Sequence, residues 1–223
     1  MIQKNMNKNS KKLICFDMDN TLIDANKLHV LAFNKAFRKN KLTIPKAKRL
    51  KRLFGRLGIL IMKELYPHLS RKEAEKVLAD HDHYVYTETK KYAKPFKGVR
   101  ETLKKLKKDY KLGIISNCKH KEIIQIIDAA NLDKKLFNVI IGNDDVKHGK
   151  PWPDEILKAE KLTHVKAEYM VGDTIYDMIA GKKAKVKTIA VLTGNHTREM
   201  LKKYKPGYII RNLKELTKVL KNG

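Results

Sequence analysis

Two aspartates, Asp17 and Asp19, follow the short apolar run 13–16 and stand two positions apart. In an extended segment, residues i and i+2 point to the same side, so both carboxylates can face one small volume. Two bare carboxylates there would repel each other, and one would be pushed to hold a proton. A bound divalent cation relieves this repulsion, and a hard ion such as Mg²⁺ suits carboxylate ligands best. The pair therefore predicts a magnesium site.

The element that must position these aspartates is a buried strand, predicted over residues 12–17. Apolar runs of this length between polar residues are typical of parallel sheets. Similar runs, separated by helical patterns, predict further strands at 112–115, 137–141, 169–171, 188–192 and 208–210. This alternation indicates βαβ units, so the predicted fold class is α/β with a doubly wound parallel sheet.

Polar side chains gather where the predicted strands end. They are Thr21 after the first strand, Ser116 and Asn117 after the second, Lys150 in the loop after the third, and Asp173 after the fourth. The ligand crevice of an open α/β sheet lies at this edge. A hydroxyl, backbone N–H groups and a lysine make a cradle for phosphate oxygens. Asp177, four residues beyond Asp173, is expected to share one face of the following helix with it.

The stretch 25–93 shows helical patterns and no strand pattern. Helices are expected from Asn26, over 57–66, and after a capping box at 70–73. We therefore predict an all-helical cap domain at 25–93, inserted into a core domain of residues 1–24 and 94–223. The polar lead 1–11 is expected to be frayed.

Composition limits the class of protein. The chain has 223 residues, 42% of them hydrophobic, which indicates a folded globular protein. Its net charge of +26 favours an anionic partner, which could be a phosphorylated metabolite, a nucleotide or a nucleic acid. A general excess of lysine on solvated helix faces explains the charge more simply. Cys15 and Cys118 are expected to be small buried hydrophobes in a reducing cytosol. No signal core or membrane span is evident, so the chain is expected to be soluble and cytoplasmic, as a monomer or homodimer.

Four segments in order resemble the motifs of the haloacid dehalogenase (HAD) superfamily of hydrolases. They are Asp17-Met18-Asp19-Asn20-Thr21, Ser116-Asn117, Lys150-Pro151-Trp152-Pro153 and Gly172-Asp173-Thr174-Ile175-Tyr176-Asp177. The stretch 25–93 falls where the phosphoglycolate-phosphatase and β-phosphoglucomutase branch carries its helical cap. The resemblance covers nearly the whole chain, and it implies a Rossmann-like core.

The resemblance implies a role for each residue of the first motif. Asp17 would attack phosphorus and become an aspartyl-phosphate, and Asp19 would protonate the leaving oxygen and then activate water. Thr21 would fix the Asp19 loop beside the substrate. Mg²⁺ would be held by the Asp17 carboxylate, the Asp19 backbone carbonyl and the Asp173 carboxylate.

The later motifs would hold the phosphoryl group. Ser116 and the backbone N–H of Asn117 would bind its oxygens, and Lys150 would neutralise charge on the nucleophile and the phosphoryl group together. Asp177 is expected to orient the ligands or Lys150 rather than to bind the metal. Asn20 replaces the glycine common at its position, and asparagine tolerates the left-handed backbone of a tight turn.

The expected function is that of a Mg²⁺-dependent phosphatase acting on a small phosphorylated metabolite. Dehalogenases of the superfamily lack an acid at the position of Asp19, which favours phosphate-ester chemistry. The alternatives are a phosphomutase of the β-phosphoglucomutase type and a basic nucleic-acid-binding protein on a non-catalytic HAD fold.

Several residues also have plainer interpretations. Ser116 or Asp173 could simply cap a helix. His81 and His83 either reach the substrate or, more often for such residues, occupy partly buried helix positions. The sequence does not reveal the substrate. The candidates for binding a second anionic group of the substrate are Arg49, Arg52, Arg56 and Arg71, although solvation at the surface explains these arginines equally well.

Overall fold

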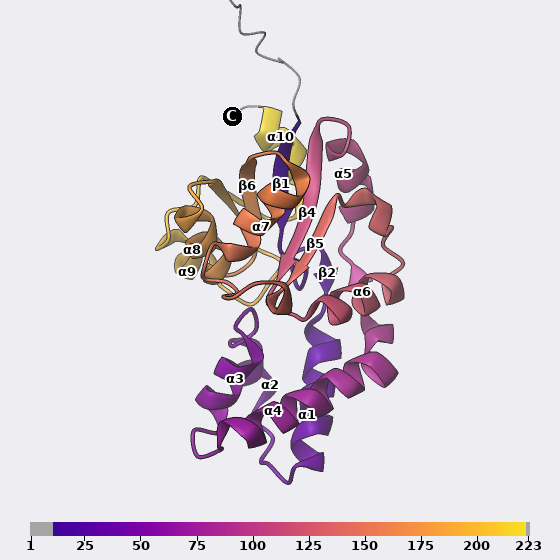
Figure 1. Cartoon of the computed structure of the whole chain (residues 1–223), viewed down its shortest axis with the longest axis vertical. Coiled ribbons are helices and arrows are strands. Elements are labelled where there is room, and N and C mark those ends of the chain that lie inside the picture. Colours follow the sequence, from indigo (N-terminus) through magenta and orange to yellow (C-terminus); the bar gives the residue numbers. More distant parts are fainter. Residues whose placement is uncertain (1–10, 222–223) are drawn as a thin grey trace, which may run out of the picture.

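A six-stranded parallel sheet forms the centre of the structure, a computed structural model that describes residues 11–221 (Figure 1). Its strand order is β5-β4-β1-β6-β7-β8, and every neighbouring pair is parallel. The strands are β1 (Lys12–Phe16), β4 (Tyr110–Ser116), β5 (Val139–Gly142), β6 (Ala167–Gly172), β7 (Lys187–Val191) and β8 (Tyr208–Ile210). The order runs outward from β1 in both directions, so the predicted doubly wound sheet is confirmed.

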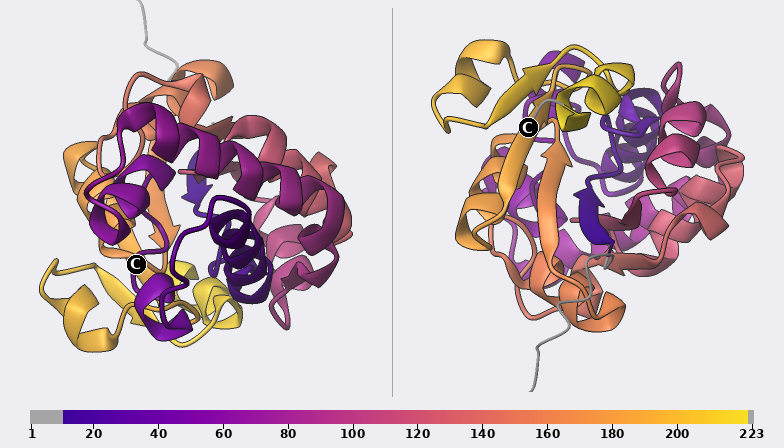
Figure 2. Two further views of the ribbon diagram at one scale, coloured as in Figure 1. Left: turned by 90° about the horizontal axis from the view of Figure 1, so that it is seen from below. Right: turned by 90° about the horizontal axis from the view of Figure 1, so that it is seen from above.

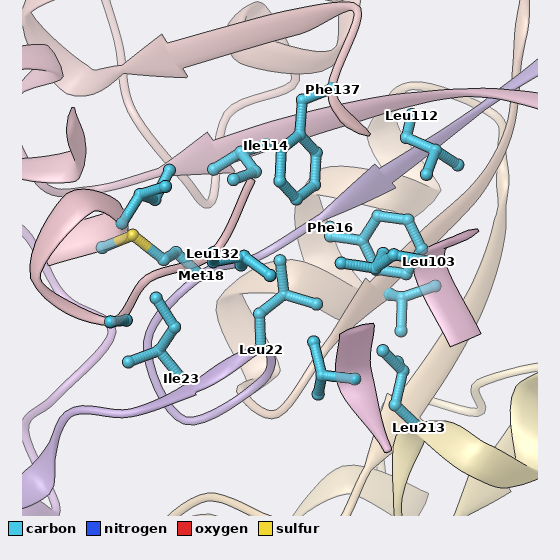
Figure 3. Packing of buried hydrophobic residues seen from close by; sticks show 14 of the residues in the cluster. Phe16, Met18, Leu22, Ile23, Leu103, Leu112, Ile114, Leu132, Phe137 and Leu213 are labelled. Carbon is cyan, nitrogen blue, oxygen red and sulfur yellow. The ribbon is translucent and has the colours of Figure 1, made fainter. Parts of the chain in front are cut away.

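Helices cover both faces of this sheet because its central strand is apolar on both sides. Ile14 and Phe16 of β1 pack in one hydrophobic cluster, whereas Leu13 and Cys15 pack in another. Figure 3 shows the first cluster, in which Phe16 lies beside residues of other elements. The helices on that face are α5 (Val99–Leu106), α6 (His120–Ala129) and α10 (Leu216–Lys221), and those on the other face are α7 (Asp154–Thr163) and α8 (Ile175–Lys183).

The helical segment after β1 lies at one end of the sheet, at the bottom of Figure 1. It has its own apolar core, formed by residues such as Phe37, Leu50 and Met62. Its helices are α1 (Asn26–Lys39), α2 (Ala47–Lys51), α3 (Gly58–Leu65) and α4 (Arg71–Tyr84), followed by helical turns at Val85–Thr89 and Lys90–Tyr92. The capping box predicted at the start of α4 is present, with Ser70 and Glu73 as its partners.

A short antiparallel pair stands where the chain leaves the sheet and returns to it. Ile23 of β2 (Ile23–Asp24) faces Pro95 of β3 (Lys94–Pro95). The pair lies at the two boundaries of the predicted division into a core of 1–24 and 94–223 and a cap of 25–93. That division stays a prediction.

Some elements differ from the expectation. β2, β3 and α9 (Arg198–Lys202) were not predicted, because segments of two to five residues are too short for a periodic pattern. The first strand ends at Phe16, one residue earlier than expected. Of the polar lead expected at 1–11, all but Lys11 lies outside the described residues.

Within residues 11–221, none of the helices combines the length and the apolar character needed to cross a membrane.

Candidate active site

The carboxyl-terminal edge of the sheet brings the predicted site residues together. Asp17 follows β1, Ser116 ends β4, and Asp173 follows β6. These strands are neighbours in the sheet, so their ends meet at one edge. Asp17, Asp19, Ser116 and Asn117 line a single cavity.

Lys150 lies at the centre of this edge and is only 2% exposed. Its Nζ donates to Oδ1 of Asp17 at 2.6 Å, to Oδ1 of Asp177 at 2.7 Å and to the carbonyl oxygen of Ile115 at 3.3 Å. Burial alone would lower the pKa of Lys150, but the two carboxylates outweigh it and hold this pKa well above its usual value. The lysine is therefore a fixed positive charge that orients Asp17.

Three buried carboxylates form a cluster at this edge, and Lys150 contacts two of them, Asp17 and Asp177. Oxygens of Asp17, Asp173 and Asp177 lie within 4.8 Å of one another. Burial raises the pKa of Asp17 to about 7, although Lys150 opposes the change. The pKa of Asp173 lies well above its usual value because of burial and of the charges of Asp17 and Asp177. Both shifts have the direction expected where carboxyl groups are buried close together, and a bound cation would oppose them.

The donor set of this cluster fits a hard divalent cation. All the grouped donors are carboxylate oxygens, which suit Mg²⁺. Both oxygens of Asp177 already accept hydrogen bonds, Oδ1 from Lys150 and Oδ2 from the N–H and hydroxyl of Thr174. Asp17 and Asp173 are therefore the carboxylates available to hold an ion, and Asp177 is placed to orient Lys150.

The expected helical pairing of Asp173 with Asp177 is wrong. Helix α8 begins at Ile175, so Asp173 precedes it. The N-cap is Thr174, whose hydroxyl accepts from the N–H of Asp177, so Asp173 does not cap this helix either. The two carboxylates approach each other because the capping box turns Asp177 back toward the strand end.

Ser116 does not cap the helix that follows it. The N-cap residue of α6 is Lys119, and the hydroxyl of Ser116 accepts from the N–H of Cys118 at 3.2 Å. Nδ2 of Asn117 donates to the carbonyl oxygen of Gly55 in the helical segment at 2.7 Å. The second motif thus also links the sheet edge to the helical segment.

The turn after Asp19 has the backbone that was expected of it. Asn20 has a φ of 60°, in the left-handed region, and its carbonyl oxygen accepts from the hydroxyl of Thr193 at 2.6 Å. The turn places Thr21 so that its hydroxyl donates to Oδ1 of Asp173 at 3.0 Å. Thr21 therefore fixes a second carboxylate of the cluster.

Gly194, in the loop after β7, allows the close approach that holds Asp173. A Cβ atom at this position would lie 1.6 Å from Oδ2 of Asp173. We expect Gly194→Ala to displace that carboxylate and to weaken Mg²⁺ binding at least about tenfold, as measured by isothermal titration calorimetry. Gly207→Ala is the control, because a Cβ there would meet only the carbonyl oxygen of Thr188, at 3.4 Å. Equal affinities in both variants would contradict the prediction.

Asp19 has two partners that the sequence did not indicate. Its Oδ2 lies 3.2 Å from Nε2 of His29 and accepts from Sγ of Cys118 at 3.1 Å. These contacts, His29 foremost, outweigh burial and hold the pKa of Asp19 below its usual value. Cys15 is fully buried as expected. Cys118 meets the expectation only in part, because it packs against the hydrophobic cluster but is half-buried and contacts this carboxylate. A histidine within the apolar stripe of α1 was the available signal for His29.

The cavity has a volume of about 530 Å³ and lies between the sheet edge and the helical segment. Figure 2 (left) shows the helices of this segment in front of the strand ends. His81 is buried and lines the cavity, whereas His83 is exposed and is not among its lining residues. Of the four candidate arginines, Arg56 and Arg71 line it. Nε of Arg56 donates to the hydroxyl of Tyr176 on α8 at 2.6 Å, which connects the segment to the core.

The chain is similar to known proteins in sequence and in fold. Residues 14–191 match the family model described as haloacid dehalogenase-like hydrolase. Pyrophosphatase PpaX of Bacillus cereus is 27% identical over 212 residues, which are 94% of this chain and 96% of that protein. The crystal structure of a hydrolase from Pseudomonas syringae has a TM-score of 0.84 at 25% identity, over 96% of this chain and 99% of that one. A predicted phosphoglycolate phosphatase from Haemophilus somnus shares the fold, with a TM-score of 0.83 at 22% identity over 94% and 98% of the two chains.

Proposed function

Since the chain belongs to the haloacid dehalogenase-like hydrolase family, we propose that it is a Mg²⁺-dependent phosphatase that forms an aspartyl-phosphate on Asp17. The observation that carries this proposal is the contact between Lys150 and Asp17 inside a cluster of three buried carboxylates. A nucleophilic carboxylate needs a fixed orientation and nearby positive charge, and this arrangement provides both.

Each residue of the cluster has a proposed task. Lys150 holds Oδ1 of Asp17, so the carboxylate keeps one orientation toward the phosphorus atom. Ser116 and the N–H of Asn117, at the end of β4, bind phosphoryl oxygens. Asp17 and Asp173, with the backbone carbonyl of Asp19, hold Mg²⁺, which when bound supplies positive charge to the phosphoryl group. In this proposal only Asp17 forms a covalent bond to phosphorus.

Asp19 is proposed to be the general acid and base. It lines the cavity, and its Oδ1 is buried with no hydrogen-bond partner within residues 11–221, so no other protein group holds the oxygen that would exchange the proton. His29 and Cys118 hold the other oxygen.

Asp19→Asn tests this assignment. With 4-nitrophenyl phosphate, whose leaving group needs little protonation, we expect a burst of about one equivalent of nitrophenolate, followed by turnover that is slower by about 10²–10⁴-fold. Stopped-flow absorbance measures both phases. Asp24→Asn, an exposed aspartate of β2, is the matched control. A steady-state rate equal to that of the wild type would contradict the role of Asp19.

The proposed substrate is a small phosphorylated molecule. A cavity of about 530 Å³ has the size of typical small-ligand sites, and it is lined by basic residues such as Arg56, Arg71 and Lys147 beside apolar ones such as Phe54. The name of the PpaX relatives makes pyrophosphate one compound to test first.

A substrate panel with phosphate release as the readout tests the function. Pyrophosphate and a series of phosphomonoesters are supplied with Mg²⁺, and we expect at least one to be hydrolysed. Asp17→Asn protein is the control for contaminating phosphatases. Transfer of phosphate between substrate molecules without its release would indicate a phosphomutase instead, and absence of any turnover would contradict the proposal.

A further inference from the structure

Three buried side chains meet between the helical segment and the sheet edge, apart from the carboxylate cluster. They are His29 on α1, His81 on α4 and Glu122 on α6, which are 7%, 5% and 4% exposed. Nδ1 of His29 lies 3.2 Å from Nε2 of His81 and 3.9 Å from Oε1 of Glu122. One donor atom from each residue lies within 4.8 Å of the others.

The hydrogen bonds of the two histidines determine which of their nitrogens carry protons. Nε2 of His29 faces Oδ2 of Asp19 at 3.2 Å, and Nδ1 of His81 faces Oδ1 of Asp82 at 3.1 Å. A carboxylate oxygen can only accept, so each of these nitrogens donates. The remaining nitrogens, Nδ1 of His29 and Nε2 of His81, face each other at 3.2 Å, so either a proton or a metal ion must lie between their lone pairs.

Glu122 supplies an independent sign of a missing partner. Its Oε1 is buried and has no hydrogen-bond partner within residues 11–221. An unpaired buried carboxyl oxygen is costly, because it has lost its hydration without compensation, and the same burial raises the pKa of Glu122 to about 8. This oxygen lies in the same small group as the two facing nitrogens.

We propose that Nδ1 of His29, Nε2 of His81 and Oε1 of Glu122 bind a divalent transition-metal ion of the Zn²⁺ class. Tetrahedral Zn²⁺ ligands stand roughly 3.3 Å apart, close to the observed spacing of the two nitrogens. All three residues line the cavity, which leaves a fourth position for water or a ligand. Two nitrogen donors favour Zn²⁺ or Co²⁺ over Mg²⁺. Mg²⁺ suits the carboxylate cluster instead, because all the donors there are oxygens.

The surroundings of the triad, His29, His81 and Glu122, match those of zinc-bound histidines. Such histidines commonly donate their second N–H to a carboxylate, and here Asp19 and Asp82 accept from His29 and His81. Because α1 and α4 belong to the helical segment and α6 packs on the sheet, a bound ion would join these two parts of the molecule.

Cobalt binding to the full-length protein tests the triad. Co²⁺ is titrated in excess Mg²⁺, and we expect one equivalent to give the intense visible bands of a four-coordinate site, which Zn²⁺ then abolishes. His81→Gln and Glu122→Gln should each weaken Co²⁺ binding at least about tenfold. Two variants should change it less than about twofold. One is Asp173→Asn, in the carboxylate cluster, and the other is His120→Gln, which removes a half-exposed histidine paired with Asp145.

Several outcomes would overturn the proposal. The first is an absence of Co²⁺ bands in wild-type protein, which would mean that only a proton lies between the histidines. The second is unchanged Co²⁺ binding in Glu122→Gln, and the third is loss of Co²⁺ binding in Asp173→Asn. Thermal unfolding establishes that each variant is folded, and Glu122→Gln, which keeps the shape of the side chain, decides the result if His81→Gln does not fold. No substrate is used, so failure here is distinct from failure of the proposed hydrolysis.

Discussion

Asp17→Asn is expected to lower kcat for phosphate-ester hydrolysis by at least about 10³-fold, because an amide cannot act as the nucleophile. The effect should be on chemistry and not on folding. Asparagine has nearly the same shape, and its Oδ1 can still accept from Lys150, which reaches Asp17 at 2.6 Å. Single-turnover kinetics and acid-quench trapping of the phosphoenzyme measure the loss directly.

The stability of Asp17→Asn distinguishes loss of the nucleophile from loss of the fold. Burial raises the pKa of Asp17 to about 7, so ionising this group at higher pH opposes folding in the absence of metal. Lys150 keeps its ion pair with Asp177 in this variant. We therefore expect Asp17→Asn, without Mg²⁺ at pH 8, to be at least as stable as the wild type. Asp109→Asn, at an exposed aspartate just before β4, is the control for activity and should keep it. Substantial turnover by Asp17→Asn would contradict the assignment of the nucleophile.

Lys150→Met is expected to have the largest effect on stability. Methionine keeps the length of the side chain but removes the only positive charge that contacts Asp17 and Asp177 among the described residues. Breaking a buried ion pair on one side leaves uncompensated charge and costs about 3–5 kcal/mol of the free energy of unfolding. Urea denaturation in the presence of a chelator measures this cost.

The activity of Lys150→Met should also fall, by about 10²-fold or more, because charge on the phosphoryl group loses a fixed counter-charge. Lys161→Met is the matched control, since Lys161 is an exposed residue of α7. We expect that control to change the free energy of unfolding by no more than about 0.5 kcal/mol. Equal stability of Lys150→Met and wild type would show that the cluster does not carry the charges assigned to it.

The sequence by itself determined the sheet and the place of its chemistry. Apolar runs between polar residues are local signals, so strands such as β1, β6 and β8 could be located from them. Parallel strands place their carboxyl ends at one edge, which is why Asp17, Ser116 and Asp173 could be expected to meet although they are far apart in the chain. The capping box of α4 was equally visible, because its partners Ser70 and Glu73 are three residues apart.

Only the tertiary structure decided which side chains contact one another across elements. His29, His81 and Glu122 come from three helices, and nothing local relates their positions. The contact of Cys118 with Asp19 and the approach of Gly194 to Asp173 likewise depend on how distant loops pack. The pairing expected for Asp173 and Asp177 failed because the i, i+4 rule holds only inside a helix, and α8 begins after Asp173. Periodicity describes how a segment folds, whereas contacts between segments are set by packing, which only the folded chain defines.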